Sequence, residues 1–106
     1  MALHHLQPAE KTSLARAASG LNARTSALVK TDAFEAAQLI LGAGDDISGH
    51  AVPGYATIHC LEGKVILRTD KNIELRPGDW LYLGRGQHHS VSAIEDSSLL
   101  VTILFG

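Results

Sequence analysis

Histidines are the side chains of this sequence that could do chemistry together. His50 follows an acidic, glycine-containing turn, and His88 and His89 follow the glycine-rich segment 84–87. Neutral imidazole binds Zn, Cu, Fe and Ni, so convergent histidines are the usual start of a metal or polar ligand site. His50 and His89 are 39 residues apart, so they can converge only if the fold brings two distant segments together. Two strands that face each other across the lumen of a small barrel would do so.

The segments between the turns are typical of β-strands. From Thr25 onward, turn-forming residues recur at short intervals, and the runs between them are rich in β-branched residues. We expect nine strands, over residues 25–31, 34–41, 47–52, 55–61, 64–69, 73–75, 80–83, 88–93 and 99–105. Many short strands at this spacing indicate a sandwich or a closed barrel. The segment Pro77-Gly78-Asp79 predicts a type II turn, and Gly63 after Glu62 predicts a hairpin.

The first residues follow a different pattern. Apolar residues recur there at helical spacing: Leu14, Ala17, Ala18 and Leu21. Pro8 suits a first helical turn and Gly20 suits a helix end. We therefore expect an N-terminal extension over residues 1–24, as a short helix or an arm, followed by one β domain over residues 25–106. His4 and His5, near the terminus, are expected to be solvated.

Composition limits the classes of partner. The 106 residues fit one domain, and 45% are hydrophobic while 19% are charged, below the average of about 25%. Because one small core hides limited surface, this excess predicts a homodimer. The basic residues do not cluster, which argues against nucleic acid, and no apolar run reaches the ~20 residues of a membrane span. Cys60 is the single cysteine, so no internal disulfide is expected, and we predict a cytoplasmic location.

Two segments carry glycine and histidine at the spacing of a known family. The pattern G-x5-H-x-H-x3-E-x6-G corresponds here to Gly44, His50, Val52, Ala56 and Gly63. The pattern G-x5-P-x-G-x2-H-x3-N corresponds to Gly78, Gly84, Gly86, His89 and Ala93. Six of these ten positions match, so the chain resembles the cupin superfamily. The resemblance implies an all-β fold, a small cupin barrel of the jelly-roll or double-stranded β-helix type.

The resemblance also implies where a metal would bind. Metal-binding cupins hold the ion with three histidines and one glutamate, and this sequence keeps the first and last histidines, His50 and His89. Val52 and Ala56 stand at the other two positions and cannot bind a metal. Catalytic sites usually have at least three protein ligands. Cys60 or water would have to complete the site, for an ion such as Zn, Fe, Mn or Ni.

Strand periodicity extends this prediction to the pocket. If Ala56 points into the barrel, as its motif position implies, then Ile58 and Cys60 do too. The opposite face, with Thr57, His59 and Leu61, then points outward and offers a surface for the dimer. The same alternation turns His89 and Val91 inward and His88 outward. The expected pocket residues are His50, Ala56, Ile58, Cys60, Tyr82, His89 and Val91.

Three functions are compatible with these residues. The first is a non-enzymatic cupin that binds a small molecule in the cavity, because two metal ligands are missing. The second is a divalent-metal enzyme of the dioxygenase or isomerase type, using His50 and His89 with Cys60 or water. The third is a metal-free acid/base enzyme, such as a sugar epimerase, that pairs His89 with Tyr82 or Tyr55. The sequence leaves open whether the protein is an enzyme and which ligand it takes.

Overall fold

The structure confirms the all-β prediction. The computed structural model describes residues 5–14 and 24–105, with the side chains of 48–50 outside this description. The described part of the chain forms nine strands, each within two residues of its predicted bounds. They are β1 (Arg24–Lys30), β2 (Phe34–Leu41), β3 (Asp46–His50), β4 (Tyr55–Glu62), β5 (Val65–Arg68), β6 (Asn72–Leu75), β7 (Trp80–Leu83), β8 (His89–Ala93) and β9 (Ser97–Leu104).

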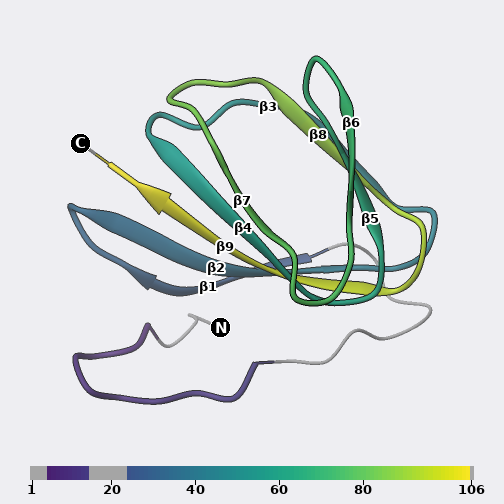
Figure 1. Cartoon of the computed structure of the whole chain (residues 1–106). Helices are drawn as coiled ribbons and strands as arrows, with labels where there is room; N and C mark the ends of the chain where they lie inside the picture. Colours follow the sequence, from purple (N-terminus) through teal and green to yellow (C-terminus); the bar gives the residue numbers. More distant parts are fainter. Residues whose placement is uncertain (1–4, 15–23, 106) are drawn as a thin grey trace.

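The strands form two antiparallel sheets. One has five strands in the order β1-β2-β9-β4-β7, and the other has four in the order β3-β8-β5-β6. Strands distant in sequence are therefore neighbours, as in a jelly roll. Figure 1 shows the ribbons of the two sheets meeting where β4 leads into β5 and spreading apart toward the C-terminus.

Alternation along the strands separates the core from the outside. In β4, Ala56, Ile58 and Cys60 are buried, whereas Thr57 and His59 on the other face are half-buried. The buried core takes residues from both sheets: Leu41, Ala56, Ile58, Cys60, Val65, Leu67, Leu75, Leu83, Val91, Ala93 and Leu99. The core therefore lies between the two sheets.

The turn at Pro77-Gly78 has the predicted geometry. Gly78 has a φ of 94°, the positive value that the second central position of a type II turn requires. The backbone N–H of Asp79 donates to the carbonyl of Arg76 at 2.8 Å, and the Asp79 carboxylate accepts from the Arg76 N–H at 2.8 Å. Asp79 therefore closes the turn that leads into β7.

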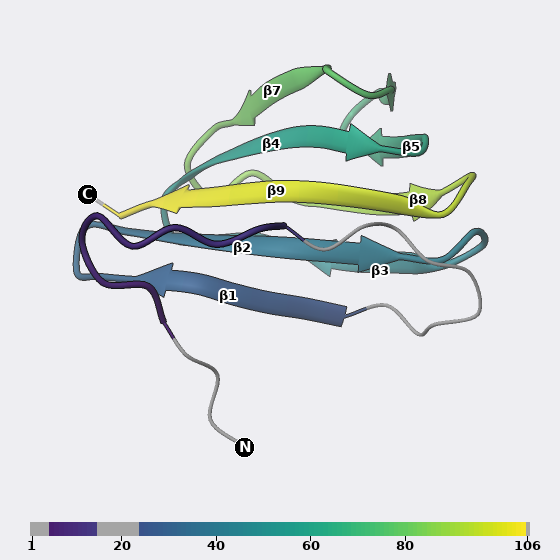
Figure 2. The same cartoon turned by 90° about the horizontal axis from the view of Figure 1, so that it is seen from below.

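The N-terminal extension runs as an arm where the structure describes it. Figure 2 shows this arm lying along β1 and β2, and the backbone N–H of Leu6 donates to the carbonyl of Leu28 at 2.8 Å. Residues 5–14 contain no helix. Pro8 and Ala9 form a turn instead, in which Ala9 has a φ of 68° that a right-handed helix does not allow. Three of the four apolar residues at helical spacing, Ala17, Ala18 and Leu21, lie outside the described residues.

The described residues include no helix with the length and apolar content needed to cross a bilayer.

Candidate functional site

A cavity of about 170 Å³ lies between the two sheets. Ten of its thirteen lining residues are apolar, from β2, β3, β4, β8, β9 and the segment after β3: Ala37, Leu39, Ile47, Val52, Ala56, Ile58, Val91, Leu99, Val101 and Ile103. The other three are Thr25, Glu35 and His89. Thr25 is exposed and Glu35 and His89 are half-buried, whereas Ile58 and Leu99 are fully buried. The cavity is therefore largely apolar, and none of its three polar lining residues is fully buried.

His89 is positioned by the loop before β8. Gly86 has a φ of 70°, and the side-chain carbonyl of Gln87 accepts from the Gly84 N–H at 2.9 Å, which holds this loop in a tight turn. The Arg85 guanidinium lies 5.0 Å from the ring centre of Tyr55 and fastens the loop to β4. His89 Nδ1 lies 3.2 Å from the Gln87 carbonyl. In a neutral ring Nδ1 therefore carries the proton, and Nε2 is the accepting nitrogen.

The structure brings together part of the predicted pocket. Ala56, Ile58, His89 and Val91 all line the cavity, as the alternation predicted. His88 is exposed, also as predicted. The backbone of His50 pairs with that of His89 in the β3–β8 ladder, and the side chain of His50 lies outside the described residues. Among the side chains that the structure does describe, no three His, Cys, Asp or Glu residues are grouped to hold a metal ion.

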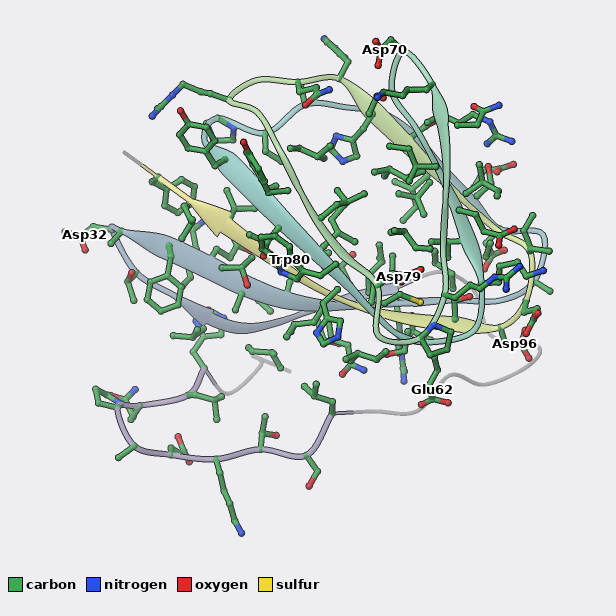
Figure 3. The ribbon with its side chains drawn as sticks, in the orientation of Figure 1. Asp32, Glu62, Asp70, Asp79, Trp80 and Asp96 are labelled. Carbon is green, nitrogen blue, oxygen red and sulfur yellow. The ribbon has the colours of Figure 1, made fainter. Side chains whose placement is uncertain are left out.

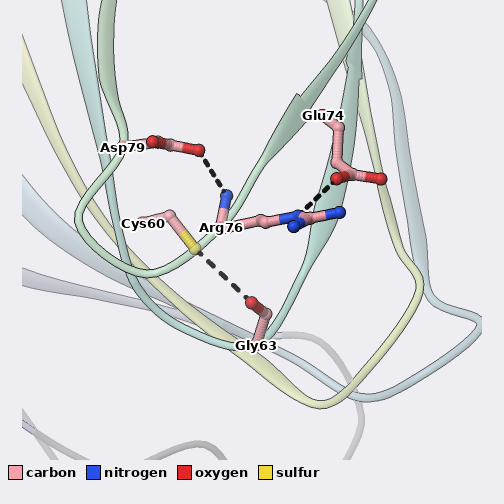
Figure 4. Close-up of polar contacts among 5 residues, drawn as sticks. All are labelled: Cys60, Gly63, Glu74, Arg76 and Asp79. Carbon is pink, nitrogen blue, oxygen red and sulfur yellow. Dashed lines mark hydrogen bonds and ion pairs between the residues drawn. The ribbon is translucent and has the colours of Figure 1, made fainter.

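Cys60 is buried but does not line the cavity. Its thiol points to the hairpin after β4, where Sγ donates to the Glu62 carbonyl at 3.5 Å. It also lies 4.0 Å from the Gly63 carbonyl, the contact drawn in Figure 4. Cys60 lies two positions further along β4 than Ile58 and belongs to the buried core, but only Ile58 is a cavity-lining residue. It is thus separated from His89, which the metal hypothesis needed as its neighbour.

We expect the Cys60 thiol to be unreactive in the folded protein. Burial, and secondarily the charge of Asp79, raise its pKa, and the thiolate is the reactive form. Because folding raises this pKa, the stability it contributes is present below the pKa of the unfolded thiol and is lost as the pH rises through the folded value. Ellman's reagent at pH 8 should label Cys60 only after denaturant is added. Rapid stoichiometric labelling of the native protein would show that the reagent reaches the Cys60 thiol and would contradict this expectation.

Tyr82 does not lie in the pocket, which corrects the prediction. It pairs with Thr57 across the β4–β7 ladder and shares its outward face, so 63% of Tyr82 is exposed. Its ring centre lies 6.4 Å from that of Trp80, which is also exposed. Tyr55 lies on the same face. Neither tyrosine lines the cavity with His89, so the structure offers no support for the acid/base enzyme that pairs them.

This outer face of the five-stranded sheet carries exposed apolar side chains at Tyr55, Trp80, Tyr82 and Leu104. They extend the surface on which the sequence predicted a dimer contact. The homodimer stays a prediction.

Glu35 is the functional candidate that sequence reasoning missed. It begins the inward row of β2, followed at two-residue spacing by Ala37 and Leu39, and all three line the cavity. Other acidic side chains differ from Glu35 in position: Figure 3 shows the labelled carboxylates of Asp32, Glu62, Asp70 and Asp96 at the periphery of the molecule. The signal was present in the alternation of β2, but it becomes visible only once β2 is known to line the cavity.

Comparisons with known proteins agree with this geometry. No family model and no curated protein sequence matches the chain. A cupin superfamily protein of Desulfitobacterium hafniense superposes with a TM-score of 0.83 at 19% identity, over 100% of both chains. An RmlC-like cupin of Desulfovibrio desulfuricans gives 0.73 at 23% identity, over 98% of this chain and 96% of the other. KdgF from Halomonas sp. gives 0.68 at 18% identity, over 76% of this chain and 77% of the other. The chain therefore has the fold of a small, single-domain cupin.

Proposed function

We propose that this protein binds a small, largely apolar molecule in the cavity between its two sheets. The observation that carries the proposal is the lining, in which ten of thirteen residues are apolar and none of the three polar ones is fully buried. Ligand sites commonly combine an apolar wall with a few placed polar groups. An apolar cavity of ~150 Å³ holds benzene, so the 170 Å³ here suits a molecule about the size of a six-membered ring.

Benzyl alcohol is a suitable probe, because it joins a ring of this size to one neutral polar group. Titration followed by amide NMR shifts should be saturable, with the shifts concentrated on β2, β4, β8 and β9. These strands supply most of the cavity wall. No saturable shift, or shifts confined to the outer face around Trp80, would contradict the proposal.

The alternative is a divalent-metal enzyme of the dioxygenase or isomerase type. One observation favours it: His50 and His89 are direct partners in the β3–β8 ladder, so two imidazoles start from adjacent backbone positions. They would hold Zn, Fe, Mn or Ni with water, and the ion would supply a Lewis acid or redox centre when bound. Cys60 does not reach the cavity lining, so it does not fit as the third ligand.

Elemental analysis separates the two functions. If the protein is a binding protein, the purified chain should contain far less than one metal ion per molecule. His50→Ala and His89→Ala should not change that content. His88→Ala is the matched control, because His88 is exposed and lies outside the cavity lining. One ion per chain that is lost in the first two variants and kept in the third would favour the metal enzyme.

A further inference from the structure

Glu35 places a carboxylate in an apolar wall. In the ladders it pairs with Ile103 of β9, which pairs in turn with Ala56 of β4. Ala37 follows it on the inward face of β2. Every other residue in this row of the cavity wall is therefore an aliphatic one.

The charge of Glu35 is not neutralised within the described part of the chain. Its carboxylate forms no hydrogen bond or ion pair with any described residue. Lys30 of β1 is its direct partner in the β1–β2 ladder, but Lys30 is exposed and forms no ion pair with it. Its carboxylate is therefore not held by another described side chain, and a cation that enters the cavity could pair with it.

The cavity lining holds a second polar group besides Glu35. Thr25 of β1 lines the same cavity and is exposed, so its hydroxyl lies at the rim. A primary ammonium has three N–H donors, which a carboxylate and a hydroxyl oxygen can accept.

We propose that the cavity selects ligands that carry a primary ammonium group on an apolar body of about ring size, with Glu35 as the residue that determines this preference. This inference rests on the proposed binding function and adds the chemical class of the ligand. The attraction is stronger here than in water, because the apolar wall lowers the effective dielectric around the charge pair. An anionic ligand of the same shape is repelled by the same carboxylate.

Three probes of one shape test the proposal: benzylamine, benzyl alcohol and benzoate, titrated at pH 7 by calorimetry or NMR. Wild-type protein should bind benzylamine at least about tenfold more tightly than benzyl alcohol, the gain of one charge-assisted hydrogen bond. Benzoate should bind most weakly. Glu35→Gln keeps the shape and removes the charge, so it should bring benzylamine down to the affinity of benzyl alcohol and leave benzyl alcohol unchanged.

Two variants test whether removing any charged side chain, and not Glu35 in particular, changes the preference for benzylamine. Lys30→Gln removes the cation opposite Glu35, and Glu74→Gln removes an exposed acid on β6; both should keep the preference for benzylamine. Circular dichroism establishes that each variant is folded. If benzyl alcohol binds but benzylamine gains nothing, or Glu35→Gln keeps the gain, the ammonium proposal is overturned and the binding function stands. If none of the three probes binds, both are overturned.

Discussion

Replacing Gly63 by alanine should destabilise the fold by about 2–5 kcal/mol, because two separate costs add. The residue has a φ of 83°, in the left-handed region, where a side chain costs about 1–2 kcal/mol. A Cβ there would also lie 2.3 Å from the Asp96 carbonyl oxygen and 2.7 Å from Ser97 Cα. These are backbone atoms, so β9 itself would have to move. Overpacking of this kind costs about 1–3 kcal/mol.

The side chain of Ser97 has little freedom to make room. Its Oγ would lie 2.3 Å from the new Cβ, and it is fully buried. It accepts from the Lys64 N–H at 3.1 Å and donates to the Glu95 carbonyl at 2.7 Å. Any shift of Oγ therefore weakens hydrogen bonds that join the β4–β5 hairpin to the start of β9.

Gly78→Ala is the matched control for Gly63→Ala. Gly78 has a φ of 94°, but a Cβ there would meet nothing within 4 Å. Only the conformational cost of about 1–2 kcal/mol remains. Urea unfolding of both variants should show the larger loss at Gly63, with unchanged m-values. Equal losses of stability in the two variants would mean that the β4–β5 hairpin moves away from β9 without cost.

Strand positions could be predicted from the sequence because each is bounded by residues with a local reason to turn. Pro77, Gly78 and Asp79 illustrate this: a fixed φ, a positive φ and a carboxylate beside a free N–H define one turn without help from the rest of the chain. Inward and outward faces were also predictable where one residue anchored the alternation, as Ala56 did for β4.

The misplaced Tyr82 and the missed Glu35 both depend on how distant strands pair and face one another, which the local sequence does not determine. In β7, Trp80 and Tyr82 alternate with Leu81 and Leu83, so both faces are apolar and the alternation does not say which is inside. The register of β7 on β4 decides it, by pairing Tyr82 with the outward Thr57. Glu35 was missed for a similar reason, since its role depends on β2 facing β8 across the cavity.

Filling the cavity is the sharpest test of where binding occurs. Ala56→Leu adds three carbon atoms at a residue that is 1% exposed and lines the cavity. We expect binding of benzyl alcohol and benzylamine to fall at least about tenfold, because each buried CH₂-sized contact that the ligand loses is worth about 0.8 kcal/mol. Stability should rise by about 0.5–2 kcal/mol, as is usual when a side chain fills an existing cavity. Calorimetric titration and urea unfolding measure the two effects on the same sample.

Ala93→Leu makes the same change where there is no space to fill. Ala93 is 3% exposed and belongs to the buried core, but it does not line the cavity. Overpacking should therefore destabilise this variant by about 1–3 kcal/mol, while the folded fraction keeps its affinity for benzyl alcohol. Opposite signs of the stability change, together with loss of binding in Ala56→Leu alone, would locate the ligand between the sheets. If Ala56→Leu is stabilised yet binds as well as the wild type, the ligand binds elsewhere on the protein.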